Sequence, residues 1–277
     1  MELQKNIQRK TTGIFEIIDQ LFFQTDKERY AGSFATSKNT KQTNIERRVK
    51  GVKEILLNSD SQLFEEDCSG VFENSTGFQA MYAGKLEKAI KCVLSSGIKK
   101  NKPKSFDLMC GNGGFALMSA AVGFPSYGID INPYLIRKAR ENLKLAVKGG
   151  FIDKDIPCKF AVGNIHQGKY LEEYFDFAMK KRYRETSMPV VTPLSTENRD
   201  PYQELGVSLD QADLIYAFPW SEHMPFLLSF LKNETKNSAI YLLPHYESMR
   251  WNEFDLKCLG CEESMPFFIG KRRAMNS

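Results

Sequence analysis

The chain has 277 residues, of which 38 are Lys or Arg and 34 are Asp or Glu, so its net charge at pH 7 is +4. This length is enough to bury a substantial core, in one large domain or in a core domain with an appended one. The small positive surplus does not by itself indicate nucleic-acid binding, and no apolar stretch approaches the roughly 20 residues of a membrane-spanning helix. With a polar N-terminus that lacks the apolar segment of a signal peptide, these properties predict a cytoplasmic globular protein.

The first hundred residues are predicted to form a helical extension or cap, residues 1–100. Apolar residues recur at a roughly helical period over 1–23, and again over 45–57 and 84–94. Between the first two of these segments, residues 31–44 are rich in Ser, Thr, Lys and Asn and are predicted to form a loop.

The stretch from Phe106 to Leu145 organises the rest of the chain. A short apolar strand ends at Asp107-Leu-Met-Cys-Gly111-Asn-Gly113-Gly, where a glycine turn can lead into a helix. Glycines accept positive φ and let a ligand approach the backbone, and the following helix offers unpaired N–H groups. A second strand ends at Asp130, whose carboxylate can accept hydrogen bonds from a ribose. The stretch therefore predicts a β-α-β-α unit with a site for a polar or anionic cofactor.

Further strands follow this unit. Residues 158–162 form a predicted third strand with Asn164 just beyond its end, where an Asn can read an adenine amino group or simply make a turn. The run from Asp213 to Trp220 is predicted to be a fourth strand that enters a turn at Phe218-Pro219-Trp220, and a fifth strand and a closing pair of strands follow. Residues 166–211 are too long for a plain connection and are predicted to hold a helix and a substrate-facing insertion. The second domain thus spans residues 101–277.

These residues resemble the class I S-adenosylmethionine-dependent methyltransferase family over roughly residues 105–271. The family's first motif is an acid followed by G-x-G-x-G, and this chain matches it except that Met109 replaces the first glycine. The resemblance implies an α/β, Rossmann-like methyltransferase fold, in which a mostly parallel central sheet is flanked by helices. It also implies S-adenosyl-L-methionine as cofactor and S-adenosyl-L-homocysteine as product.

The resemblance assigns roles to particular residues. Gly111 and Gly113 would lie against the methionine part of the cofactor, Asp107 would help to hold its amino end, Asp130 would bind the ribose hydroxyls and Asn164 would face the adenine. The full set of implied cofactor-binding residues is Asp107, Met109, Cys110, Gly111, Gly113, Asp130, Ile131, Asn164, Ile165 and Phe218.

The methyl acceptor is open. Family members that methylate a base amine carry Asp or Asn before Pro-Pro and an aromatic residue, and Ala217-Phe-Pro-Trp220 lacks that acid or amide. Trp220 is predicted to pack a substrate beside the sulfonium, and Glu222 and His223 are candidates for taking a proton or for starting a helix. We rank a small molecule first as acceptor, then a protein, then RNA or another nucleic acid.

Two other functions compete with this one. Gly111, Gly113 and Ala116 also satisfy G-x-G-x-x-A, a pattern of NAD(P)-binding Rossmann oxidoreductases, although that class leaves Asp107, Asn164 and the Phe-Pro-Trp turn unexplained. A catalytically silent methyltransferase-like module could instead bind a partner through the N-terminal helices. No metal is predicted, because Cys258-x-x-Cys261 has no second pair of ligands close by.

Overall fold

The computed structural model describes residues 35–68, 83–95, 102–166, 172, 200–218, 224–244, 254–259 and 267–272. The chain divides into two compact units, residues 1–46 and 47–277. The second unit contains the whole sheet, helix α3 and most of helix α2, so it begins within the segment predicted to be an extension. The predicted functional boundary near residue 100 remains a prediction.

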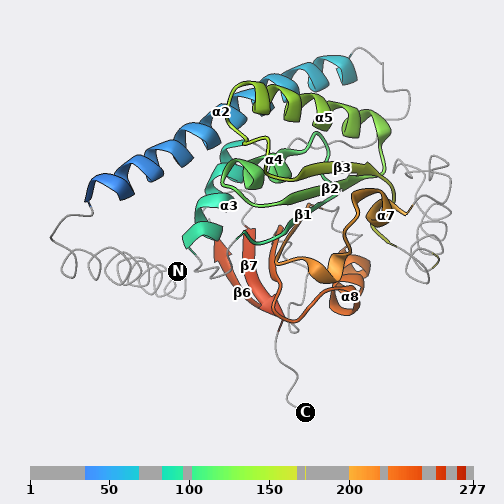
Figure 1. Cartoon of the computed structure of the whole chain (residues 1–277). Helices are drawn as coiled ribbons and strands as arrows, with labels where there is room; N and C mark the ends of the chain where they lie inside the picture. The colour runs from blue at the N-terminus through green and yellow to red at the C-terminus, as the bar shows by residue number, and fades with distance from the viewer. Residues whose placement is uncertain are drawn as a thin grey trace, which may run out of the picture. The chain divides into compact units, whose positions relative to one another are not determined.

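A seven-stranded sheet forms the centre of the second unit, in the order β3-β2-β1-β4-β5-β7-β6 (Figure 1). Strands β1 to β5 are parallel, and β7 runs antiparallel to both of its neighbours, β5 and β6. The strands are β1 Ser105–Leu108, β2 Ser126–Asp130, β3 Cys158–Val162, β4 Leu214–Ala217, β5 Ile240–Pro244, β6 Phe254–Leu259 and β7 Phe267–Arg272. This mostly parallel sheet with flanking helices confirms the predicted Rossmann-like methyltransferase fold, including the closing pair of strands.

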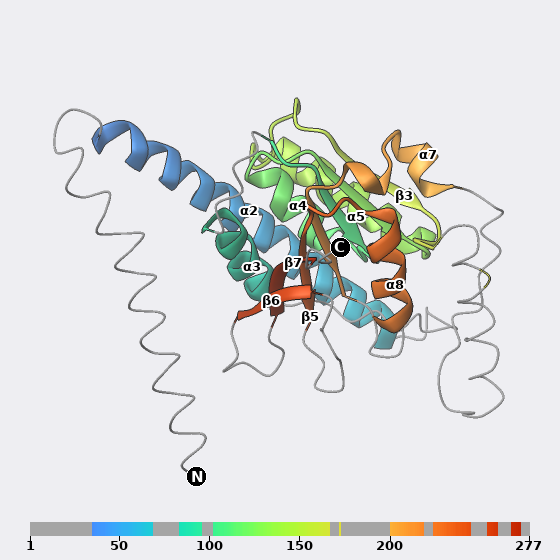
Figure 2. The ribbon, with the colours of Figure 1, turned by 90° about the horizontal axis from the view of Figure 1, so that it is seen from below.

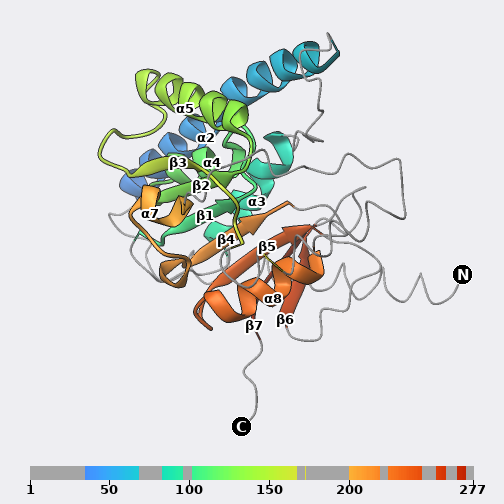
Figure 3. The same ribbon diagram turned by 90° about the vertical axis from the view of Figure 1, so that its right-hand side faces the viewer.

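Helices cover both faces of the sheet. The helices are α2 Ala35–Cys68, α3 Ala83–Ser95, α4 Gly114–Ala121, α5 Pro133–Lys148, α7 Pro201–Leu205 and α8 Met224–Glu234, with a 3-10 turn at Leu209–Gln211. Helices α4 and α5 lie on one face, and α7 and α8 lie on the other (Figure 3). Figure 2 shows α3 and α8 on opposite sides of β5 and β7. None of the described helices is long and apolar enough to cross a membrane.

The alternation of side chains along β1 decides which residues reach which helices. Phe106 and Leu108 are fully buried in the core cluster that includes residues of α8, whereas Ser105 and Asp107 face α4. Successive side chains of a strand point to opposite faces, so an acid between two apolar residues is carried to the helix that follows the glycine turn. The fold therefore delivers the carboxylate of Asp107 to the start of α4.

Helix α2 is longer than predicted, because it begins at Ala35 and includes most of the segment 31–44 that was predicted to be a loop. Ser, Thr and Asn lower helix propensity only modestly, and a helix already formed at residues 45–57 propagates more easily than a new one nucleates. The buried positions Val49, Val52, Leu56 and Leu63 form the apolar stripe that holds the later part of α2 on the second unit.

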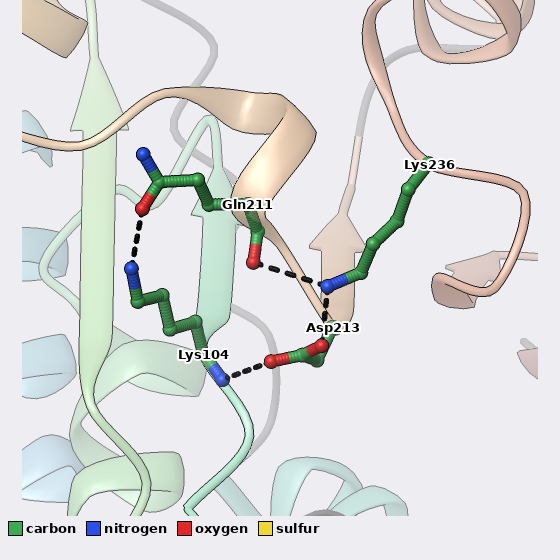
Figure 4. Close-up of polar contacts among 4 residues, drawn as sticks. All are labelled: Lys104, Gln211, Asp213 and Lys236. Carbon is green, nitrogen blue, oxygen red and sulfur yellow. Dashed lines mark hydrogen bonds and ion pairs between the residues drawn. The ribbon is translucent and has the colours of Figure 1, made fainter.

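A polar network closes the end of the sheet opposite the glycine turn (Figure 4). The backbone N–H of Lys104 donates to Asp213 Oδ2 at 2.9 Å, and Lys236 Nζ forms an ion pair with the other carboxylate oxygen. Lys236 Nζ also donates to the backbone oxygen of Gln211 at 3.3 Å, and Lys104 Nζ donates to its side chain. Asp213 therefore links the starts of β1 and β4 to the turn before β5.

We expect Asp213→Ala to lower the free energy of unfolding by about 1–3 kcal/mol, because it leaves a half-buried backbone N–H and a lysine without their shared acceptor. Asp213→Asn keeps one acceptor oxygen and should lose less. Urea denaturation measures both, with Asp155→Ala on the exposed surface as control. A loss for Asp213→Ala no larger than that of the control would contradict this assignment.

Candidate functional site

The turn between β1 and α4 has an unusual backbone at three positions. Met109, Gly111 and Gly113 have φ angles of 62°, 54° and 89°, all in the left-handed region. Glycine adopts this region without penalty, whereas a residue with a side chain is strained there by about 1–2 kcal/mol. Met109, where the sequence departs from the family's glycine pattern, thus adopts the conformation that glycine favours. The side chain at position 109 therefore does not exclude a left-handed backbone there.

Asp107 lies under this turn. Its Oδ2 accepts a hydrogen bond from the backbone N–H of Ala116 at 2.9 Å, in the first turn of α4. The residue is only 1% exposed, and among the described residues Oδ1 has no hydrogen-bond partner. Burial raises the pKa of Asp107 to about 7, against the backbone N–H groups of Ala116 and Phe115, which lower it. An acceptor buried without a partner is costly, which points to a ligand that would satisfy it.

Asp130 holds the same turn from β2. Its Oδ2 accepts from the backbone N–H of Gly111 at 2.8 Å, and its Oδ1 accepts from the backbone N–H of Asn132 at 2.9 Å. Burial raises the pKa of Asp130, and these backbone hydrogen bonds oppose the rise. The charge of Asp130 in turn contributes to the raised pKa of Asp107. Two buried carboxyl groups therefore lie close enough to interact, and a cation between them would be stabilised by both.

The two acids lie where open α/β sheets bind their ligands. Strand β1 pairs with β2 on one side and with β4 on the other, although β4 comes much later in the chain. The strand order reverses at this point, and the crevice beyond the carboxyl ends of the strands is the usual ligand site. Sequence reasoning placed the acids and the glycine turn correctly at this edge.

The segment after β3 is held by one local hydrogen bond and by one from α7. Asn164 Oδ1 accepts from the backbone N–H of His166 at 2.9 Å, the turn geometry that was the alternative to an adenine contact. Tyr202 of α7 donates its hydroxyl hydrogen to the backbone oxygen of Ile165 at 2.9 Å. His166 is 2% exposed and makes an edge contact with the ring of Phe230 at 5.1 Å between centroids. The role of Asn164 toward adenine stays a prediction.

The remaining predicted residues fall into two groups. Cys110 and Ile165 are buried, and Ile131 and Phe218 are half-buried beside the ends of β2 and β4. The predicted catalytic residues lie outside the described part of the chain: Trp220, Glu222 and His223. No cluster of three possible metal-ligating side chains occurs among the described residues. Cys258 belongs to β6, and Cys261 lies outside the described residues.

Four polar residues at the glycine turn were not predicted. Asn112 Nδ2 donates to Asp60 Oδ1 at 2.7 Å and lies 3.4 Å from Ser59 Oγ. Asn142 Nδ2 donates to Ser59 Oγ and to the backbone oxygen of Asn112, both at 3.1 Å. A signal existed in the sequence, because Ser59 interrupts the apolar stripe Val52, Leu56, Leu63 of α2. A buried polar residue on such a stripe requires a polar partner.

We expect Met109→Ile to destabilise the protein by about 1 kcal/mol more than Met109→Leu, because branching at Cβ is least compatible with a positive φ while the two side chains are isomers of equal size. Thermal denaturation of the two variants measures the difference. Equal stabilities would contradict the left-handed conformation at this position.

We expect Asp107→Asn to stabilise the folded protein at pH 8. The folded pKa of about 7 lies above the ordinary value of 3.8, so the folded state binds more protons and this stability is lost as the pH rises through 7. The amide keeps an acceptor for Ala116 and carries no buried charge, so the gain should be about 1–3 kcal/mol at pH 8 and small at pH 4. Denaturation curves of both proteins at the two pH values measure the gain. An Asp107→Asn variant whose stability relative to wild type is lower at pH 8 than at pH 4 would contradict the predicted sign.

Neither a protein-family model nor a curated protein sequence matches the chain. Similar solved structures include an RNA methyltransferase from Salinibacter ruber in complex with S-adenosyl-L-homocysteine, which is 15% identical, with 68% of this chain and 93% of that one covered and a TM-score of 0.44. Ribosomal protein L11 methylase from Lactobacillus delbrueckii subsp. bulgaricus is 12% identical, with 68% and 78% covered and a TM-score of 0.41. Precorrin-6y C5,15-methyltransferase from Geobacter metallireducens GS-15 is 10% identical, with 68% and 89% covered and a TM-score of 0.38. Identities of this size leave each residue's role to the geometry of the site.

Proposed function

We propose that this protein is an S-adenosyl-L-methionine-dependent methyltransferase whose cofactor binds across the glycine turn between Asp107 and Asp130. One observation carries the proposal: two buried carboxyl groups flank a left-handed turn at the point where the strand order reverses. The cofactor brings a methionine ammonium, a sulfonium and a ribose to such a place, and each matches a feature of the turn.

The ammonium group fits Asp107. A cation there would give Oδ1 the hydrogen-bond donor that the described residues do not provide, and it would offset the repulsion between Asp107 and Asp130. A neutral ligand could satisfy the oxygen but would leave the electrostatic cost. The chemistry of the buried pair therefore favours a cofactor with a positive charge.

The ribose fits Asp130. Each of its carboxylate oxygens accepts one backbone hydrogen bond, from Gly111 or from Asn132, and can accept a second. The two backbone donors fix the orientation of the carboxylate before a ligand arrives, which reduces the entropy that binding must cost. Vicinal hydroxyls suit such a pre-oriented pair of acceptors.

Two glycines let the turn pack closely against the interior of the protein. A Cβ on Gly113 would lie 2.8 Å from the ring of Phe160 and 3.0 Å from Ala139 Cβ. A Cβ on Gly128 would lie 2.5 Å from the same ring and 2.9 Å from Cys110 Sγ. These glycines let β2, α5 and the ring of Phe160 pack together beneath the turn, and this packing supports a turn of fixed position as the binding surface for the cofactor.

The oxidoreductase alternative fits this protein less well. The common dinucleotide-binding sheet has the order 3-2-1-4-5-6, whereas here an antiparallel β7 lies between β5 and β6. A pyrophosphate at the glycine turn would also place negative charge beside Asp107 and Asp130. The silent binding module differs from the proposed enzyme only in activity, so a turnover measurement separates those two.

The bound sulfonium supplies an already activated methyl group, and the protein's part is to orient the acceptor and exclude water. Phe218 at the end of β4 begins the Phe-Pro-Trp turn, for which we propose the acceptor side of the site. Trp220 would pack the acceptor, and Glu222 or His223 would take its proton. We propose a small molecule as the acceptor, ahead of a protein and of RNA. The Phe-Pro-Trp turn lacks the Asp or Asn that would hold a base amine, and the sequence has neither a basic patch concentrated enough for RNA nor a feature that marks a peptide groove.

Calorimetric titration with S-adenosyl-L-homocysteine and, separately, with NADH tests this proposal. We expect the wild type to bind the first and not the second. Asp130→Ala should weaken S-adenosyl-L-homocysteine binding at least about thirtyfold, because the ribose loses a charged acceptor and Gly111 loses the partner that shapes the turn.

The control is a melting curve for each protein, so that affinities are compared only where both are folded. The surface variant Asp155→Ala should bind as the wild type does. Binding of NADH alone would support the oxidoreductase instead, and an unchanged affinity in folded Asp130→Ala would remove the ribose assignment.

A further inference from the structure

The turn is held by the sheet on one side and by α2 on the other. Asn112 occupies the middle of Gly111-Asn-Gly113, between two residues in the left-handed region, and is 6% exposed. Its side chain donates to Asp60 Oδ1 at 2.7 Å, and its backbone oxygen accepts from Asn142 of α5 at 3.1 Å. The residue at the centre of the glycine turn therefore faces the helical extension through its side chain.

Ser59 joins the two asparagines. Its Oγ accepts from Asn142 Nδ2 at 3.1 Å and lies 3.4 Å from Asn112 Nδ2. Ser59, Asn112 and Asn142 are at most 6% exposed, so the network is shielded from water and each bond in it is costly to break. It connects α2, the glycine turn and α5, three elements far apart in the sequence.

We propose that Ser59 and Asp60 are positioning residues for the cofactor: they fix the glycine turn in its binding conformation, so α2 is part of the cofactor-binding machinery. The inference rests on the function proposed above. It assigns a role to the extension beyond capping the core. Glycines at 111 and 113 leave the backbone free to adopt several conformations, so contacts from outside the turn are needed to select one, and the hydrogen bonds between α2 and Asn112 supply part of that restraint.

Other contacts hold α2 without reaching the turn. Arg48 Nη1 and Nη2 donate to Asp153 at 2.8 and 2.9 Å. Asp153 lies between α5 and β3, before the start of β3, whereas the glycine turn follows the end of β1. Lys53 Nζ pairs with Glu87 of α3 at 2.9 Å. The Arg48 to Asp153 pair therefore offers a matched control, because breaking it loosens α2 and leaves Asn112 untouched.

Asp60 holds Asn112 through one carboxylate oxygen, Oδ1. Burial raises the pKa of Asp60 to about 6, and the hydrogen bond from Asn112 opposes the rise. An amide at this position keeps an oxygen for Asn112 Nδ2, so Asp60→Asn is a conservative variant that separates the hydrogen bond from the charge.

The test compares S-adenosyl-L-homocysteine affinity, by calorimetry, with melting temperature. Asp60→Ala should weaken binding about tenfold, Asp60→Asn should stay within threefold of wild type, and Asp153→Ala should lower the melting temperature while its affinity stays within twofold. A purely structural role predicts instead that affinity follows melting temperature in all variants. Wild-type affinity in Asp60→Ala, or an equal loss in Asp153→Ala, would overturn the inference.

A swapped pair keeps the test decisive if Asp60→Ala does not fold. Asn112→Asp removes the donor and opposes two acids, so it should weaken binding, and adding Asp60→Asn restores one donor and one acceptor across the same gap. Recovery in the double variant supports the positioning role, and no recovery overturns it. A wild type that fails to bind S-adenosyl-L-homocysteine refutes the proposed function and this inference with it, whereas normal wild-type binding with insensitive variants refutes this inference alone.

Discussion

The hydrogen bonds from backbone N–H groups to two buried carboxyl groups, Asp107 and Asp130, are the interaction on which the site depends. Ala116 N–H at 2.9 Å fixes one acid to α4, and Gly111 N–H at 2.8 Å fixes the other to the turn. Burial of two acids in one place is unfavourable, as their raised pKa values indicate. Burying the two acids lowers the stability of the folded protein, and a bound cation would offset this cost. Perturbed acids of this kind are common at binding sites.

The surrounding elements make this arrangement tolerable. The alternation of β1 directs Asp107 toward α4, while Phe106 and Leu108 anchor the strand in the core on the other face. Glycines at 113 and 128 allow close packing against Phe160, and α2 and α5 tie Asn112 in place. A turn with three left-handed residues is thus restrained from several directions by the protein itself.

Much of this arrangement could be predicted from the sequence. The strand, glycine turn and acid patterns lie within 40 residues, Phe106 to Leu145, so local periodicity was enough to place β1, α4, β2 and α5. The contacts of Asp60 and Ser59 with Asn112 join residues more than 50 positions apart, and only the packing of α2 brings them together. The start of α2 was missed for a different reason: Ser, Thr and Asn were taken as loop formers, although an established helix can extend through them. The motif indicates a glycine-like conformation at Met109, but only the backbone φ angle of the structure establishes it.

A crystal structure of the protein with S-adenosyl-L-homocysteine tests the central claim most directly. The account predicts the amino group of the ligand at Oδ1 of Asp107, the ribose hydroxyls at the carboxylate of Asp130, and a glycine turn unchanged from the ligand-free form. A ligand bound elsewhere, or a turn that must rearrange to receive it, would contradict the claim that these two acids and the turn between them form a preorganised cofactor site.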